Sequence, residues 1–253
     1  MNNLTERQKE MKEKFIQARG YWAEHWNDLL TLDEEFFGAF LNLSAVPWKK
    51  GSLDPKVKEF IYIAINASTT HLYEPGIQAH MQNAIKYGAT PEEIMEVLEL
   101  TSALGIHTCA SGIPILMDEL KNAGVELNLE LTPKQKQLKE QFKKERGYWS
   151  ELNEFLLVDD GFFEAYLAFS ALPWKKGVLE PKIKEFIYIA IDVATTHLYE
   201  PGARMHIKNA LKYGADKEEL MEVLQLVSVL GIHTCTVGVP ILKEVMKSNI
   251  IES

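Results

Sequence analysis

The sequence predicts an all-α protein made of two fused, homologous helical repeats, residues 1–127 and 128–253. The segment TTHLYEPG occurs at 69–76 and again at 195–202, and other segments recur at the same spacing of 126 residues. Runs rich in Lys, Glu, Leu, Met and Ala dominate, and no alternating strands flank an Asn-Gly or Asp-Gly turn. A duplicated unit of this length indicates two fused domains rather than a solenoid of short repeats.

Each repeat is expected to contain its elements in the same order. An amphipathic segment of one or two helices and a further helix are followed by a loop with two prolines and a glycine. A helix that is apolar nearly all round, and therefore buried, comes next, and three more helical segments complete the repeat, the last of them buried too. In the first repeat these elements are expected at 5–30, 33–45, 47–55 (the loop), 56–70, 75–88, 90–104 and 106–124.

Local signals set several helix ends. Pro75 and Gly88 fit the preference for proline in the first turn of a helix and glycine after the last. Thr90 followed by Glu93 is a capping box, and Asp216 and Glu219 repeat it in the second half. The link between the repeats is expected within 124–133.

Composition narrows the classes of function. The chain has 253 residues, of which 46% are hydrophobic and 25% charged, as in an ordinary globular protein. A net charge of −9 argues against nucleic acid as a partner. We expect no membrane partner, because no apolar run is long enough to span a bilayer, and no signal peptide, because the first residues are charged. The expected location is therefore the cytoplasm.

Polar side chains that agree between the repeats are the candidate site residues. Six of the seven histidines belong to this set, which leaves only His25 outside it. The candidates are Glu59, His71, Glu74, His80 and His107 in the first repeat, and Glu185, His197, Glu200, His206 and His233 in the second.

His80 and Glu59 suggest proton transfer. Histidine is the side chain best suited to moving protons near neutral pH, and His80 lies among other titratable groups. Glu59 has two interpretations. It is either a first-turn glutamate favoured by the helix dipole, or a partly buried carboxylate that holds a proton. Asn66, and Asp192 in the second repeat, fall on the same helix face, so this polar stripe needs partners if it is buried.

Two further interpretations of these side chains stay open. His71, Glu74, His80 and His107 carry donor types that bind metals, but donor type alone is weak support, so we expect no metal and no other cofactor. Cys109, which Cys235 matches, is either a small core side chain or a thiolate activated by His107.

The later two-thirds of each repeat resembles the carboxymuconolactone decarboxylase and alkylhydroperoxidase D-like family. The resemblance rests on KxKEFIYIAI, a break, and then EPGxxxHxxNAxKYGAxxEExMEVLxLxxxLGIHT. In the family pattern a glutamate near the start of one helix and a histidine on the next precede a glycine and an acidic pair. These positions are Glu59, His80, Gly88 and Glu92-Glu93, and again Glu185, His206, Gly214 and Glu218-Glu219.

The resemblance points to the decarboxylase branch. The peroxidase-like branch carries Cys-x-x-Cys before the histidine, and this chain has none, so we expect no peroxidase of that type. The decarboxylase branch reads like E-L-R-M-H at the histidine. Arg204-Met205-His206 is close to that pattern, whereas Gln78-Ala79-His80 departs from it.

The resemblance implies an all-helical fold, hexameric or trimeric symmetry and a lyase. We expect a cofactor-independent proton-transfer enzyme that acts on a small carboxylated or lactone-like molecule, and a homotrimer. His80 and His206 would be the acid/base groups, with Glu59, Glu185, His71, His107, His197 and His233 beside them. Glu74, Glu200 and Arg204 would bind the substrate, Arg204 because its guanidinium suits a carboxylate. A metal-dependent enzyme and a non-catalytic ligand-binding scaffold are the alternatives.

Overall fold

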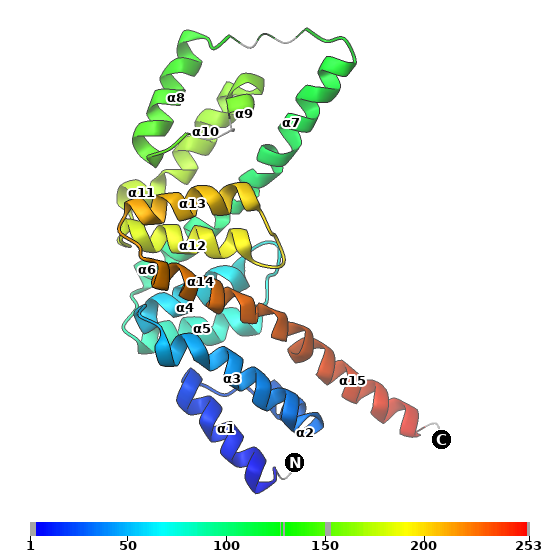
Figure 1. Ribbon diagram of the computed structural model, residues 1–253. Coiled ribbons are helices and arrows are strands. Elements are labelled where there is room, and N and C mark those ends of the chain that lie inside the picture. Colours follow the sequence, from blue (N-terminus) through cyan, green and yellow to red (C-terminus); the bar gives the residue numbers. More distant parts are fainter. Residues whose placement is uncertain (1–3, 127, 129, 150–152, 252–253) are drawn as a thin grey trace.

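The computed structural model describes residues 4–126, 128, 130–149 and 153–251 (Figure 1). Within this part of the chain every regular element is a helix, which confirms the all-α prediction. The first repeat contains α1 (Glu6–Arg19), α2 (His25–Leu32), α3 (Glu34–Lys50), α4 (Pro55–Ala67), α5 (Glu74–Lys86), α6 (Pro91–Ser102), the 3-10 turn η1 (Ala103–Ile106) and α7 (His107–Asn122). The second contains α8 (Pro133–Arg146), α9 (Asn153–Val158), α10 (Asp160–Ser170), α11 (Leu172–Lys176), α12 (Pro181–Val193), α13 (Glu200–Lys212), α14 (Lys217–Ser228), η2 (Val229–Ile232) and α15 (His233–Ile251).

The apolar helices α4 and α12 form the centre of the molecule and pack against each other. Asp54 caps α4 by accepting from the Lys56 N–H, and Pro55 occupies the first turn. At the end of the pair, Thr70 Oγ1 lies 3.3 Å from the equivalent Thr196 Oγ1. Because equivalent residues meet there, a local two-fold axis relates the repeats. The predicted capping boxes at Thr90 and Asp216 are present.

The two repeats interlock. Helices α1–α3 lie at one end of the molecule and α8–α10 at the other, with the central helices between them (Figure 1). The last helix of each repeat packs on the first helices of the other, so that Cys109 of α7 joins the α8–α10 cluster and Cys235 of α15 joins the α1–α3 cluster. The two central hydrophobic clusters also draw side chains from both repeats.

Two buried ion pairs tie the repeats together. Lys58 Nζ lies 2.7 Å from Glu222 Oε1, and Lys184 Nζ lies 2.7 Å from Glu96 Oε1. The second oxygen of Glu222 accepts the N–H groups of Ser52 and Leu53 at 2.7 and 2.9 Å. These bonds satisfy buried charges that would otherwise be costly.

Two local predictions were wrong. The loop expected at 47–55 is shorter, because α3 continues through Pro47 to Lys50. The carbonyl of Pro47 accepts bonds from Lys58 Nζ and the Gly51 N–H, which hold this last turn in place. The last helix of the repeat, expected to be buried, contains no buried residue in α7, because only one side of it packs against the second repeat.

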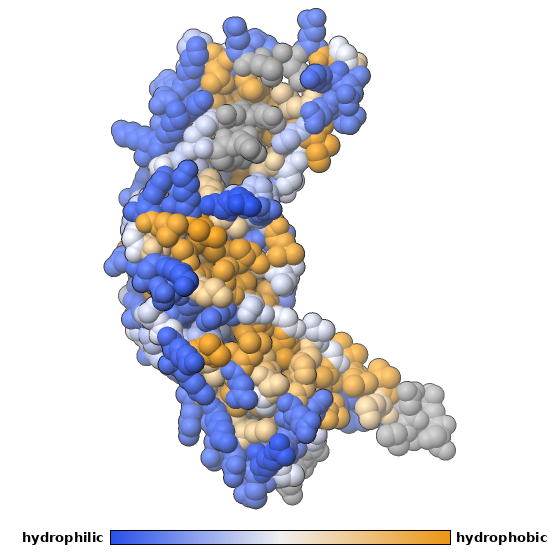
Figure 2. Space-filling model, in the orientation of Figure 1, coloured by the Kyte–Doolittle hydropathy of each residue, from blue (hydrophilic) through white to orange (hydrophobic). Residues whose placement is uncertain are grey.

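We expected no segment to be apolar enough to span a bilayer. Judged by length and composition alone, this expectation was also wrong. In the described part of the chain, Pro91–Asn122 and Lys217–Lys247 are both long and apolar enough. Only 22% and 33% of their most apolar windows are buried, so much of this surface faces outward. Figure 2 shows apolar residues along α15 and over the middle of the molecule.

Candidate active site

A histidine and a glutamate form a buried pair in each repeat. His206 on α13 places Nδ1 2.6 Å from Glu185 Oε2 on α12, and His80 on α5 places Nδ1 2.6 Å from Glu59 Oε2 on α4. All four side chains are buried. The glutamates are therefore buried and bind histidine, instead of merely complementing a helix dipole. Each Nε2 is left as the ring's other proton-carrying position.

Aromatic rings fix the orientation of both histidines. Tyr188 stacks on His206 with ring centroids 4.5 Å apart, and Tyr148 meets its edge. Tyr62 and Tyr21 hold His80 in the same way. Burial is the largest cause that raises the pKa of Tyr21 to about 12, so its hydroxyl stays protonated at neutral pH.

Each site also contains a buried arginine that the sequence analysis missed. Arg146 and Arg19 are 3% and 4% exposed and lie over the rings of Tyr188 and Tyr62, respectively. Arg19 Nη1 donates to the Ser44 carbonyl at 3.2 Å, and Arg146 makes the equivalent bond to the Ser170 carbonyl. The repeated RGYW at 19–22 and 146–149 was the signal that could have revealed them.

The remaining histidines pair between the repeats. His107 Nδ1 lies 2.7 Å from His197 Nε2, and His233 Nδ1 lies 2.8 Å from His71 Nε2. Tyr199 stacks on His107 with centroids 3.9 Å apart, and Tyr73 does the same on His233. Each site is thus completed by a histidine from the other half of the chain.

Burial keeps these paired groups neutral. It is the largest cause that lowers the pKa of His107 to about 3 and that of His233 to about 3, and neighbouring histidines add to it. Burial also raises the pKa of Asp192 to about 8, with the charge of Glu185 as a second cause. The 3.7 Å approach of His107 Nδ1 to Asp192 Oδ1 is therefore a contact between largely neutral groups at pH 7, not an ion pair.

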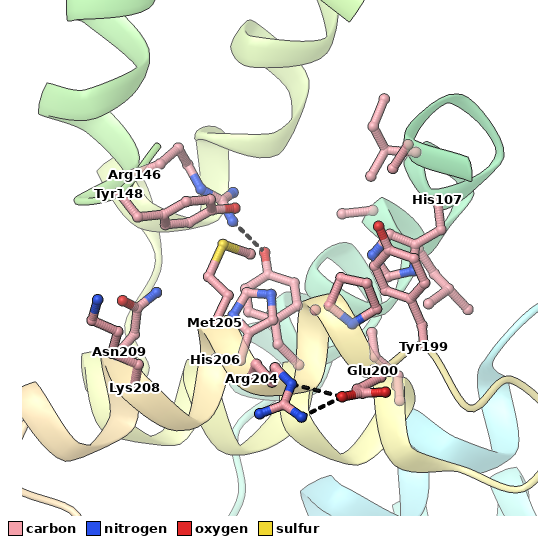
Figure 3. A pocket seen from close by; sticks show the side chains of 18 of the residues that line it. His107, Arg146, Tyr148, Tyr199, Glu200, Arg204, Met205, His206, Lys208 and Asn209 are labelled. Atoms are coloured by element: carbon pink, nitrogen blue, oxygen red, sulfur yellow. Dashed lines mark hydrogen bonds and ion pairs between the residues drawn. The ribbon is translucent and has the colours of Figure 1, made fainter. Parts of the chain in front are cut away.

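The two sites differ in the space beside them. A cavity of about 1140 Å³ adjoins the second-repeat site and is lined by His206, Arg146, Tyr148 and His107 (Figure 3). The equivalent space beside His80 and Arg19 measures about 30 Å³. Arg204 and Glu200 form an exposed ion pair that also lines the large cavity (Figure 3). Glu74 is exposed at the start of α5.

The metal donor set that the sequence left open is not brought together in the described residues. His71 pairs with His233, His107 pairs with His197, and His80 pairs with Glu59. Closeness in the sequence did not predict these contacts, because the partners of His71 and His107 come from the other repeat. Cys109 lies in the cluster of α7 with α8–α10, as expected of a small core side chain.

Comparisons with known proteins agree with the helical architecture. A model of the carboxymuconolactone decarboxylase family matches residues 34–106 and 160–234. A crystal structure from Burkholderia xenovorans LB400, described as a "putative gamma-carboxymuconolactone decarboxylase subunit", is similar with a TM-score of 0.92 and 43% sequence identity. The match covers 96% of this chain and 98% of that one. No curated protein matches the chain significantly.

Proposed function

Because the chain belongs to the carboxymuconolactone decarboxylase family, we propose that it is a lyase that decarboxylates a small carboxylated lactone by proton transfer. The observation that carries this proposal is the buried His206–Glu185 pair on the wall of the large cavity. A buried, oriented histidine can deliver a proton inside a cavity that admits a small molecule.

The cavity supplies the other requirements of the reaction. The guanidinium of Arg146 lines it and is a suitable partner for a substrate carboxylate. Arg204, at the exposed side, adds positive charge near the cavity. Both groups favour an anionic substrate.

The proposed reaction needs one bond cleavage and one protonation. The bond between the substrate carbon and its carboxylate breaks, CO₂ leaves, and the electron pair spreads onto the lactone carbonyl. His206 then transfers the proton on Nε2 to a carbon of this delocalised anion, while its Nδ1–H donates to Glu185. Glu185 stabilises the protonated ring and fixes its orientation, as a carboxylate does for a catalytic histidine. Water restores the proton on His206.

A thiol peroxidase is disfavoured as the alternative. The two cysteines lie in separate clusters, Cys109 with α8–α10 and Cys235 with α1–α3. An attacking and a resolving thiol must meet to form a disulfide, and these packing positions keep the pair apart.

Turnover of γ-carboxymuconolactone, the compound in the name of the similar structure, tests the proposal. We expect CO₂ release by the wild-type chain, and at least a 100-fold loss of kcat in His206→Gln, because general acid catalysis contributes about 10²–10⁴-fold. Glu185→Gln should lose activity in the same direction, and His25→Gln should retain it. No turnover of this or related carboxylated lactones would favour the ligand-binding scaffold instead.

A further inference from the structure

We propose that a divalent transition-metal ion binds beside the second-repeat cavity, held by His107, Asp192 and His197. This site differs from the donor set considered from the sequence, and it runs against the expectation that no metal is bound. It goes beyond the proposed lyase chemistry, in which His206 and Glu185 need no ion.

The three donor atoms converge. One ligand atom from each side chain lies within 4.8 Å of the other two. The two imidazole nitrogens of His107 and His197 are 2.7 Å apart, and His107 Nδ1 is 3.7 Å from Asp192 Oδ1. Tetrahedral ligands at bond lengths of about 2.0–2.1 Å stand about 3.3 Å from one another. These two separations lie on either side of that value and the third is at most 4.8 Å, so side-chain shifts would bring the three donors to tetrahedral spacing.

Asp192 gives the independent sign of a missing partner. Its side chain is 1% exposed, and its Oδ2 atom has no hydrogen-bond partner among the residues that the structure describes. A buried carboxylate oxygen normally has a hydrogen bond, an ionic partner or a metal. A bound cation would give this oxygen a partner.

The first repeat provides an internal comparison. His71 Nε2 and His233 Nδ1 are 2.8 Å apart there, matching the second-repeat pair, but Asn66 stands where the second repeat has Asp192. Asn66 donates from Nδ2 to the Tyr62 carbonyl at 2.7 Å, and its Oδ1, like Asp192 Oδ2, has no hydrogen-bond partner among the described residues, so the two repeats differ in the charge of this group. A neutral amide gives a weaker ligand set than a carboxylate for a divalent ion. We therefore infer one metal site per chain.

The position suggests what the ion would do. Two histidines and a carboxylate suit Zn²⁺ and related first-row ions, and three protein ligands leave a coordination position open. His107 lines the cavity, and His206 Nε2 lies 4.0 Å from Asp192 Oδ2. An ion there would offer its open position to an anionic oxygen of a molecule in the same cavity.

Zinc binding without any substrate tests the site. The full-length chain, stripped with chelator and titrated with Zn²⁺ in a calorimeter, should bind one equivalent. Co²⁺ at the same site should give the visible absorption of a low-coordinate N/O site. Asp192→Asn, which copies the first-repeat residue, should weaken Zn²⁺ binding by at least about 100-fold, beyond the 10–100-fold typical of losing a residue behind a ligand. His25→Gln, which alters the one histidine outside the repeated set, should bind zinc normally.

The reciprocal variant sharpens the result. Asn66→Asp should add a second equivalent, with thermal unfolding confirming that the chain is folded. The proposal is overturned if the wild type binds no zinc, or if Asp192→Asn binds it as tightly as the wild type. A folded Asn66→Asp chain that gains no site would contradict the role given to the carboxylate. Because no substrate enters this experiment, its failure leaves the lyase proposal standing.

Discussion

Arg204 shows how one residue can distinguish the two sites. Its Nε donates to Glu200 Oε1 at 2.7 Å, and its side chain is 78% exposed beside the large cavity. The first repeat has Gln78 at this position. A substrate carboxylate would thus contact Arg204 at the exposed side of the cavity or Arg146 in its buried wall.

Arg204→Gln should weaken binding of an anionic substrate about tenfold, a loss of about 1.4 kcal/mol. We expect this modest size because solvent screens an exposed ion pair. KM for the carboxylated lactone, or calorimetric affinity for a carboxylate inhibitor, measures the effect. Gln78→Ala is the matched control and should change affinity much less. Equal effects of the two substitutions would show that the difference between the repeats is irrelevant to binding.

The lowered pKa of His233 predicts that the folded state loses stability in acid. Its pKa is lowered to about 3 by burial, with His71, His80 and His25 as further causes. An unfolded histidine has a pKa of about 6.5, so the unfolded chain binds more protons between pH 6.5 and 3. The contribution of His233 to the free energy of unfolding is therefore full above pH 6.5 and is lost as the pH falls toward 3.

Urea unfolding at pH 7 and pH 4 checks this. The wild type should be less stable at pH 4, and His233→Gln should lose less stability over the same interval. Comparing the change with pH, and not the absolute stability, removes any general cost of the substitution. Identical pH dependence in both chains would mean that His233 does not titrate as described.

At the residue scale, the repeated sequence identified the polar groups that lie together in the structure, but only some of the contacts between them. Glu59 and His80 were paired correctly because they lie on consecutive helices. The pairing of His107 with His197 could not be predicted, because it depends on how the repeats interlock. Arg19 and Arg146 were missed since a lysine- and arginine-rich first helix reads as solvent-exposed.

At the element scale, the buried lysine–glutamate pairs determine how α14 and α6 attach to the other repeat. Glu222 on α14 bonds both Lys58 and the backbone before α4. A Cβ on Gly51 would lie 1.9 Å from Glu222 Oε1, so glycine leaves room for this carboxylate. Through these bonds Glu222 holds α14 against the segment that leads into α4.

Glu222→Gln should destabilise the fold by about 3–5 kcal/mol, because it leaves the buried Lys58 without its counter-charge. The free energy of unfolding from urea titration measures the loss. Glu218→Gln, on an exposed position of the same helix, is the control and should stay within about 0.5 kcal/mol of the wild type. A loss of less than 1 kcal/mol in Glu222→Gln would show that the pair does not hold the repeats together.

At this scale the sequence predicted where the helices lie, but not which of them are buried. The capping boxes and the apolar run of α4 set their elements from local sequence alone. The exposure of α7 could not be read from its composition, because an apolar helix can be buried in its own repeat, in the other repeat or against another chain. Pro47 was interpreted as a loop signal, yet α3 continues through it to Lys50, and Lys58 Nζ donates to its carbonyl.

At the scale of the whole molecule, α15 carries an exposed apolar surface. Among the side chains of α15 that the structure describes, five large apolar ones are exposed, several of them four residues apart and therefore on one face. They are Val237, Ile241, Leu242, Val245 and Met246. Exposed apolar patches of this kind mark interaction surfaces.

We propose a homotrimer in which these faces are covered, since closed cyclic symmetry buries such a surface without leaving an open end. Light scattering at micromolar concentration should give a mass of three chains of 28.8 kDa each. Ile241→Glu together with Val245→Glu should lower that mass, whereas Glu218→Gln should not. A monomeric wild-type chain would contradict the prediction.

In the mechanism that we propose, His206, held by Glu185, delivers a proton to a carbon of the substrate in the open second-repeat site. Decarboxylation of γ-carboxymuconolactone in D₂O, followed by NMR of the product, tests it most directly. We predict that the wild type and His80→Gln release CO₂ and place one deuterium on a carbon of the product, whereas His206→Gln does neither. Full turnover by His206→Gln, or loss of turnover only in His80→Gln, would contradict the account.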